Sequence, residues 1–246
     1  MRYEVVFDNK TFRNKLIDIA ENLKTKYNNV YPRNLGYYTA SNNCFSFDCW
    51  NLVKTLIWGW KPEKIEGYYC YEPDKYGLGD WDGKKILNCC SEISSDFTYI
   101  QVGEFLLTQD GNHAGIYIGD YKYANSMFNV VEATPIWFGG VQFSWVDNLG
   151  VRKRNKNDSA SWSKWKYHGL LPWVEYKYKE KDKEEKKKER ERKIELIHEN
   201  YCSQYDKLAT EIIEGKWGNG AQRIKALNSC GYDYKYAQSL VDARLK

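Results

Sequence analysis

The chain has 246 residues, 42% of them hydrophobic and 16% aromatic, and its formal net charge is +4 at pH 7. This length and composition predict one or two domains with enough apolar residues for a core. The excess charge is local, because residues 177–193 hold ten Lys or Arg and six Asp or Glu, which leaves 27 charges of each sign elsewhere. A neutral remainder disfavours a nucleic-acid-binding protein, which needs basic residues on a folded face.

The sequence also lacks the signals of several other classes. The N-terminal segment MRYEVVFDNK has no apolar core followed by a small-residue cleavage site, and no apolar run is long enough to span a bilayer. The seven cysteines are odd in number and form no CxxC pair, which indicates neither a disulfide scaffold nor a structural zinc site. We therefore expect a mainly reduced chain made in a cytoplasm, with no cofactor, no metal and no membrane insertion.

Two helices are predicted near the N-terminus. Asp8 offers a cap, and apolar residues then recur at spacings of three and four: Phe12, Leu16, Ala20, Leu23 and Tyr27. This pattern predicts a helix of about four turns. Residues 31–43 follow as a predicted loop, and a second helix is expected from Asp48 or Cys49 to about Trp58.

From residue 102 onward the pattern changes to the alternation of strands. A short helix is expected first, around residues 84–91. Strands are then predicted at 102–108, 113–119, 129–134 and 141–146, and residues 167–176 close the block. Helices followed by an antiparallel meander indicate an α+β domain over residues 1–176.

The remainder of the chain reads as a tether and a small helical module. Residues 177–196 form a charged linker, helical or disordered, because they have too little apolar surface to pack. Apolar periodicity returns in residues 197–246, which we expect to form a three-helix bundle with helices near 203–214, 220–228 and 233–245.

The stretch SFDCWNLVK places Cys49 at the start of the second helix. A thiol in this position feels the positive end of the helix dipole, and the free N–H groups there can stabilise a thiolate or an oxyanion. The sequence offers three histidines as a base: 113, 168 and 198. A buried, inert cysteine is the simpler alternative for any single cysteine.

His113 is the best-placed base because it opens the strand HAGIYIG directly after a DGN turn. Alternation puts His113, Gly115 and Tyr117 on one face and the apolar residues on the other. In the next strand, NVVEATP, Glu132 shares a face with Val130 and Thr134. If the two strands pair, Glu132 reaches the outer ring nitrogen of His113 and orients the ring.

Three motifs in this order, FDCWNLVK, HAGIYIG and VVEATP, resemble those of NlpC-type and CHAP cysteine peptidases over roughly residues 1–176. The resemblance implies a papain-like α+β fold with an antiparallel sheet, in which Cys49 is the nucleophile, His113 the base and Glu132 the orienting group. Two features depart from the NlpC-type pattern: Trp50-Asn51 replaces small residues, and Glu132 stands where a His is common. Cys44 is the rival nucleophile, but NNCFSF provides no helix start.

The segment EIIEGKWGNGAQRIKALNSCGYDYKYAQSLVDARL resembles the Cpl-seven-type cell-wall-binding repeat of phage lysins. This resemblance implies that the module binds the disaccharide-peptide unit of peptidoglycan without a metal. Trp217 and Tyr232 are the candidates to stack on sugar, and Arg223 is the candidate to pair with a peptide carboxylate. The alternative is a helical module that serves oligomerisation, with Trp217 in its core.

Both resemblances imply one polymer as the partner, bacterial peptidoglycan. The expected protein is a phage endolysin, made in the host cytoplasm without a signal peptide and acting on the wall after release. The enzyme would be either a cysteine endopeptidase or an N-acetylmuramoyl-L-alanine amidase, and the sequence leaves the bond and the oligomeric state open. The alternatives are an inactive wall-binding protein and a toxin or acyltransferase with the same triad.

Overall fold

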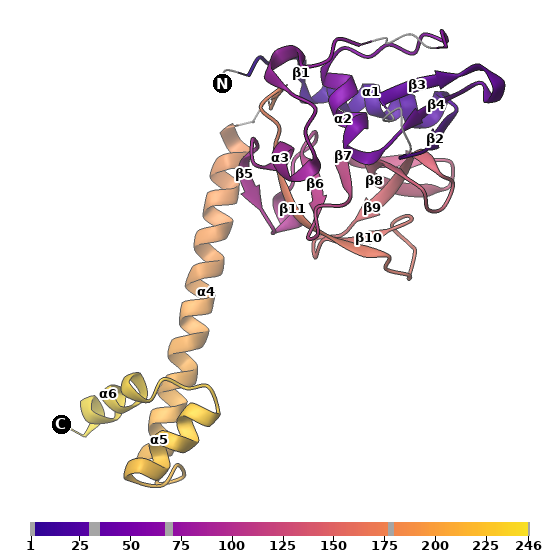
Figure 1. Cartoon of the computed structure of the whole chain (residues 1–246). Helices are drawn as coiled ribbons and strands as arrows, with labels where there is room; N and C mark the ends of the chain where they lie inside the picture. Colours follow the sequence, from indigo (N-terminus) through magenta and orange to yellow (C-terminus); the bar gives the residue numbers. More distant parts are fainter. Residues whose placement is uncertain (1–2, 30–34, 67–70, 177–179, 246) are drawn as a thin grey trace. The chain divides into compact units, whose positions relative to one another are not determined.

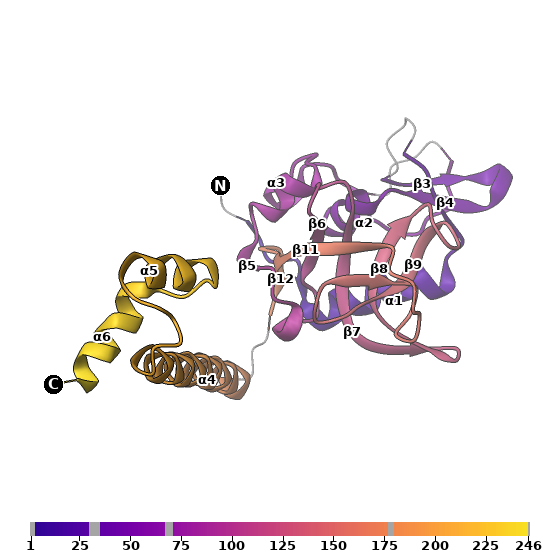
Figure 2. The ribbon, with the colours of Figure 1, turned by 90° about the horizontal axis from the view of Figure 1, so that it is seen from below.

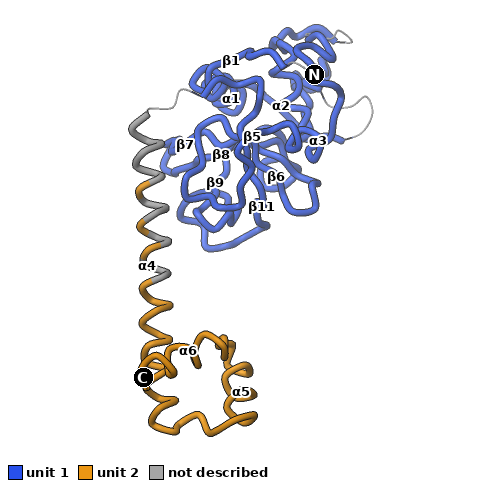
Figure 3. The backbone as a smooth tube through the Cα atoms, turned by 90° about the vertical axis from the view of Figure 1, so that its left-hand side faces the viewer, with its two compact units in different colours: residues 1–177 blue, residues 178–246 orange. Residues whose placement is uncertain are grey.

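The computed structural model describes residues 3–29, 35–66, 71–176 and 180–245 (Figure 1). The chain divides into two compact units, residues 1–177 and 178–246, which we call the N-terminal unit and the C-terminal unit (Figure 3). Each unit packs around its own apolar core. Of the predicted linker, residues 177–179 lie outside the described residues, and the rest is part of a helix.

The N-terminal unit combines twelve strands and three α-helices among its described residues. Its strands are β1 (Phe7–Asp8), β2 (Thr25–Tyr27), β3 (Leu35–Thr39), β4 (Cys44–Phe47), β5 (Ser91–Ser94), β6 (Phe105–Thr108), β7 (Ala114–Tyr123), β8 (Ser126–Thr134), β9 (Gly140–Val146), β10 (Val151–Lys153), β11 (Ser163–Leu170) and β12 (Val174–Glu175). Its helices are α1 (Asn9–Asn22), α2 (Cys49–Ile57) and α3 (Gly83–Leu87).

Six of these strands close into an antiparallel barrel. The order is β10-β9-β8-β7-β6-β11, and pairing between β10 and β11 joins the two ends, while β5 extends β11 outside the barrel (Figure 2). The expected papain-like α+β fold with a separate three-helix bundle is therefore wrong. The prediction failed because β10 is only three residues long and reads VRK, without the alternation that marks a strand.

A tight turn before β10 makes this closure possible. Asp147 Oδ1 accepts hydrogen bonds from the backbone N–H of Leu149 (3.0 Å) and of Val151 (2.9 Å). Gly150 has a φ of +76°, and a Cβ atom there would stand 2.6 Å from the carbonyl oxygen of Trp165. Only glycine fits both the left-handed backbone and the close approach, so Gly150 brings β10 onto β11.

The barrel wall separates two environments, as the alternation in β7 and β8 predicts. The outward side chains are apolar and pack with α1 and α2, which lie over this part of the barrel in Figure 1: Ala114, Ile116, Ile118, Val131, Ala133 and Phe143. The inward side chains include a smaller apolar cluster around Leu106, Val130 and Trp165. Glu132 also points inward and is 0% exposed. The barrel interior is thus apolar at one place and charged at another.

The region before Cys49 is more regular than the sequence predicts. The first helix ends at Asn22, and β2 takes the place of its expected last turn. Within the predicted loop 31–43, residues 31–34 lie outside the described residues, and β3 follows them. Strands β2, β4 and β3 form a three-stranded sheet in that order. This sheet holds β4, which leads directly into α2.

A buried ion pair ties β11 to the segment before β6. His168 Nδ1 contacts the Glu104 carboxylate, and His168 Nε2 lies 2.9 Å from the Asp96 carbonyl oxygen. Because both partners can only accept, both ring nitrogens must carry a proton. Burial lowers the pKa of His168, but Glu104 outweighs burial and raises that pKa above its usual value. His168 is therefore a structural cation without a free ring nitrogen.

The C-terminal unit consists of α4 (Glu180–Ile213), α5 (Gly220–Ser229) and α6 (Tyr234–Arg244). Its first helix is 34 residues long, instead of the short helix predicted near 203–214, because the charged segment is rich in the strong helix formers Glu and Lys. The core comprises Tyr205, Leu208, Ala209, Ile212, Leu227, Ala237 and Val241. Within the described residues, no helix has both the length and the apolar character needed to cross a membrane.

Candidate functional site

Cys49 is the first residue of α2, where β4 delivers the chain to the helix. Asp48 caps the helix: its carboxylate accepts hydrogen bonds from the backbone N–H of Asn51 (2.9 Å) and from the Nδ2 of Asn51 (2.5 Å). The Cys49 side chain packs against the barrel, is 2% exposed, and places Sγ 3.9 Å from the carbonyl oxygen of Asn112. The predicted helix-start position of the thiol is therefore present, but the thiol is buried.

The loop between β6 and β7 places His113 beside this thiol. Thr108 Oγ1 donates to Asp110 (2.6 Å) and accepts from the backbone N–H of His113 (3.1 Å). Cys49 Sγ lies 3.9 Å from the carbonyl oxygen of Asn112, and a hydrogen bond from the backbone N–H of Ala114 lowers the pKa of the thiol. The structure thus brings Cys49 to the two neighbours of His113, although no hydrogen bond among the described residues joins Sγ to the His113 ring.

Glu132 contacts His113 through the pairing of β7 and β8, in which Gly115 is opposite Glu132. His113 Nε2 is hydrogen-bonded to Glu132 Oε2, and the His113 side chain is 17% exposed while Glu132 is fully buried. Burial raises the pKa of Glu132, but His113 and Arg152 outweigh burial and lower that pKa to about 2. Glu132 is therefore a carboxylate, so Nε2 carries the proton, and in the neutral ring Nδ1 is left to act as a base.

Arg152 completes this arrangement and was not predicted from the sequence. Its Nε donates to Glu132 Oε1 (3.0 Å), and its Nη2 donates to Glu132 Oε2 (2.5 Å) and to Thr134 Oγ1 (3.2 Å). A planar guanidinium suits this two-pronged contact with a carboxylate. Arg152 lies in the run VRKR, where its inward direction is hidden because exposed and buried basic residues look alike in sequence.

Two tryptophans frame the charged groups. Trp165 stacks on His113, with 5.2 Å between ring centroids and 23° between planes. The guanidinium carbon of Arg152 lies 4.7 Å from the ring centroid of Trp137 and 5.8 Å from that of Trp165. These contacts restrict the His113 ring and the guanidinium to one orientation each.

Burial, not the helix terminus, decides the charge of Cys49. Burial and then Asp48 raise the pKa of the thiol to about 12, although backbone N–H groups of Ala114, Trp50 and Cys49 lower it. A rise from 9.0 to about 12 corresponds to about 4 kcal/mol against the thiolate. A helix N-terminus is worth roughly 0.3–1 kcal/mol, so it does not offset the effect of burial on the thiol. Cys49 rests as a neutral thiol.

The rival groups occupy structural positions. Cys44 lies in β4, is 2% exposed, and points Sγ at the carbonyl oxygen of Phe45 (3.5 Å). Burial raises the pKa of the Cys44 thiol as well. His168 uses both ring nitrogens in its buried ion pair. The side chain of His198 lies outside the described residues.

In the C-terminal unit, the three candidate binding residues contact the unit itself. Trp217 Nε1 donates to Glu211 (3.0 Å), and the Trp217 ring meets Tyr232 edge-on with centroids 5.8 Å apart. Arg223 donates to the Gly218 carbonyl oxygen (2.9 Å), to Asn219 Oδ1 (3.0 Å) and to Gln238 Oε1 (3.3 Å). All three side chains are half-buried, so their role in binding stays a prediction.

No group of three or more His, Cys, Asp or Glu side chains within the described residues could hold a metal ion.

Comparison with known proteins finds one family. Residues 206–245 match the CW_7 repeat, a cell-wall-binding repeat, so this part of the chain has a cell-wall-binding function. The match covers α5, α6 and the end of α4 and leaves the N-terminal unit unassigned. No curated protein and no solved structure matches the chain.

The geometry around Cys49 predicts that Asp48→Asn lowers the pKa of the thiol from about 12, because the variant removes the negative charge next to it. Asparagine is an equally good helix cap, and its Nδ2 can donate to Asn51 Oδ1, which has no hydrogen-bond partner here. Burial persists, so the pKa should stay above the usual thiol value of about 8.5. The measurement is the pH dependence of Cys49 alkylation by iodoacetamide, followed by peptide mass spectrometry.

The matched control is Asp82→Asn, which changes the corresponding cap of α3. An alkylation profile that is the same in wild type and Asp48→Asn would show that Asp48 does not set the charge of the thiol.

Proposed function

We propose that the N-terminal unit is a thiol hydrolase that cleaves a peptide or amide bond of bacterial peptidoglycan, and that the C-terminal unit holds it on the wall. The observation that supports this proposal best is the buried Arg152–Glu132–His113 chain, which ends beside a cysteine at a helix start. The CW_7 repeat supports the choice of substrate, because its function is cell-wall binding and peptidoglycan is a polymer of the bacterial wall.

In the first step, Cys49 Sγ attacks the carbonyl carbon of the scissile amide while His113 Nδ1 takes the thiol proton. Because the resting thiol is neutral, the transfer of its proton to His113 must accompany the attack. Glu132 stabilises the imidazolium that forms, through its contact with Nε2. The backbone N–H groups of Cys49 and Trp50 at the start of α2 have no intrahelical partner and can donate to the developing oxyanion.

In the second step, His113 returns the proton to the leaving nitrogen, the C–N bond breaks, and a thioester on Cys49 remains. Water, deprotonated by His113, then hydrolyses the thioester and regenerates the thiol. The same sequence serves a stem-peptide endopeptidase and an N-acetylmuramoyl-L-alanine amidase, because both cut an amide. Glu132 and Arg152 are positioning residues in this scheme.

The proposed setting is that of a bacteriophage endolysin, made in the host cytoplasm and acting on the wall after release. A tether to an insoluble substrate favours such an enzyme, because each cleaved bond leaves many others within reach.

Cys49→Ser and His113→Ala should each lower the rate of wall clearance by several orders of magnitude, because either change interrupts the attack. The measurement is the turbidity of purified walls, with mass spectrometry of the released fragments to identify the bond. Cys44→Ser is the matched control, a buried thiol in β4 that should be dispensable. Full clearance by folded Cys49→Ser would exclude the thiol mechanism and leave an inactive wall-binding protein or another nucleophile.

Arg152→Met should lower the turnover rate of the enzyme. It should also shift the acid limb of the pH–rate profile to higher pH. His113 and Arg152 hold the pKa of Glu132 at about 2, so removing the guanidinium raises that pKa and Glu132 is neutralised at higher pH. Lys153→Met, in the same strand, removes a partly exposed pair to Asp147 (3.3 Å) that does not contact Glu132, and should leave the profile unchanged. An acid limb that stays in place in Arg152→Met would show that the guanidinium supports only the fold.

Removing residues 178–246 should leave hydrolysis of a soluble muropeptide unchanged, because the N-terminal unit has its own core. Clearance of walls at low enzyme dose should fall by about 10- to 100-fold, since tethering raises the effective concentration on the polymer. The dose dependence of clearance, measured for both chains, tests this. Equal dose curves for the full and the shortened chain would contradict the tethering role.

A further inference from the structure

An exposed aromatic group lies next to the charged chain that ends at His113. Phe138 is 75% exposed and Trp162 is 55% exposed, and a contiguous group of exposed large apolar side chains often marks a binding surface. Phe138 comes from the connection between β8 and β9, and Trp162 from the connection between β10 and β11. With Trp137 and Arg154 they form what we call the aromatic shelf.

The contacts within the shelf are specific. The Trp137 and Trp162 rings meet edge-on, with centroids 5.9 Å apart and an angle of 88° between planes. The guanidinium carbon of Arg154 lies 4.7 Å from the Phe138 ring centroid. Trp137 has a φ of +60°, which is costly for a bulky residue and is found where the surrounding structure requires it. The two connections are therefore held together as one surface.

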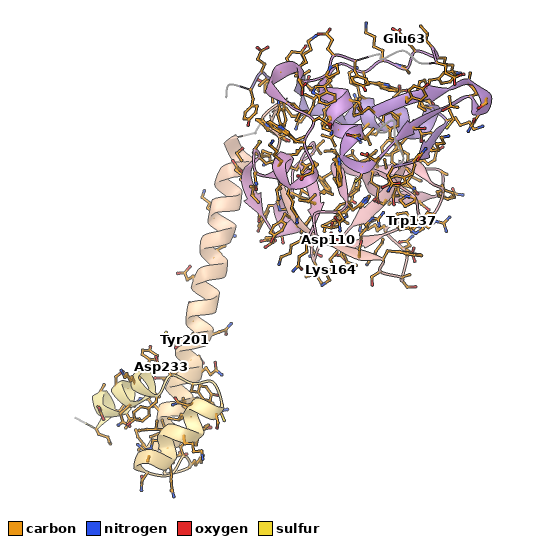
Figure 4. The ribbon with its side chains drawn as sticks, viewed as in Figure 1. Glu63, Asp110, Trp137, Lys164, Tyr201 and Asp233 are labelled. Atoms are coloured by element: carbon orange, nitrogen blue, oxygen red, sulfur yellow. The ribbon has the colours of Figure 1, made fainter. Side chains whose placement is uncertain are left out.

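The shelf is continuous with the candidate active site through one residue. Arg152 contacts the face of Trp137 (4.7 Å) while its guanidinium binds Glu132, the partner of His113. Figure 4 shows Trp137 toward the same end of the N-terminal unit as Asp110, whose loop positions His113, and far from Glu63. A polymer that occupies the shelf can therefore reach the active site.

The segment of the chain that carries Arg154 and Trp162 is basic. Between residues 147 and 166 the exposed basic side chains are Arg154, Lys156, Lys164 and Lys166. The same stretch contains two acidic residues, Asp147 and Asp158, and Asp147 pairs with Lys153 at 3.3 Å. The ligand should therefore combine a flat apolar face with a negative group.

We propose that the aromatic shelf binds a sugar ring of the peptidoglycan strand, with Arg154 pairing with a carboxylate of the peptide attached to it. An indole packs well against the C–H face of a pyranose, and a guanidinium pairs with a carboxylate through charge-assisted hydrogen bonds. This inference rests on the proposed function for the identity of the polymer. Exposed aromatics with basic residues also suit single-stranded nucleic acid, but the wall-binding repeat in the same chain favours the wall polymer.

The test is fluorine NMR of full-length Cys49→Ser protein labelled with 5-fluorotryptophan, with the Trp162 signal assigned from Trp162→Phe. The Trp162 signal should shift on titration with a peptidoglycan disaccharide-peptide, which this variant does not consume. Arg154→Gln should weaken that response about tenfold while leaving the response to an uncharged chito-oligosaccharide unchanged. Arg154→Lys should restore it in part.

Several outcomes would overturn the proposal. The first is a Trp162 signal that does not shift at a saturating concentration of disaccharide-peptide. The second is a Trp162 signal that shifts only with a single-stranded oligonucleotide. The third is a Trp162 signal that shifts with protein concentration alone, which would indicate that a second copy of the chain binds there. Because binding is measured without turnover, the result is independent of the proposed chemistry. A shift in Trp162 together with inactive wild type would reject the hydrolase and keep the shelf, whereas wall cleavage without a shift would reject the shelf alone.

Discussion

The ion pair between Glu132 and Arg152 is the interaction on which the rest of the N-terminal unit depends. A carboxylate that is 0% exposed costs several kcal/mol unless a cation and hydrogen bonds compensate for lost water. Arg152 supplies both, and it can do so only because β10 closes the barrel between β9 and β11. The strand that completes the fold is therefore also the strand that keeps Glu132 ionised and His113 in the tautomer with a free Nδ1.

The thiol and the carboxylate show that the neighbours of a buried group decide its charge, because burial alone raises the pKa of both. Glu132 is buried with two cationic partners, and its pKa falls to about 2. Cys49 is buried next to the negative Asp48 without such a partner, and its pKa rises to about 12. A buried neutral thiol resists oxidation and adventitious alkylation, because the thiolate is the reactive form. In the proposed mechanism, the thiol therefore stays unreactive until its proton passes to His113 during attack on a substrate.

Local patterns in the sequence predicted the parts of the site that local physics determines. Asp48 caps a helix that starts at Cys49, and alternation places His113 and Glu132 on one side of paired strands. The closed barrel and Arg152 could not be predicted in this way, because β10 pairs with β11 across residues 154–162 and has no alternation of its own. The raised pKa of Cys49 could not be predicted for a related reason. Burial of the thiol depends on what packs over the helix start, and the sequence of the helix does not determine this.

Two arginines near β10 serve two different surfaces. Arg152 lies within β10 and faces Glu132 inside the barrel, whereas Arg154 follows the last residue of β10, where strand alternation no longer applies, and contacts Phe138 on the exposed shelf. Trp137 lies between them, with one ring face on the Arg152 guanidinium and an edge-on contact to Trp162. A ligand that displaced Trp137 would disturb the Arg152–Glu132 contact, whereas one that packs on Trp162 would leave it intact. Occupation of the shelf is therefore compatible with an ordered candidate site only if the ligand packs on the outer edge of the aromatic group.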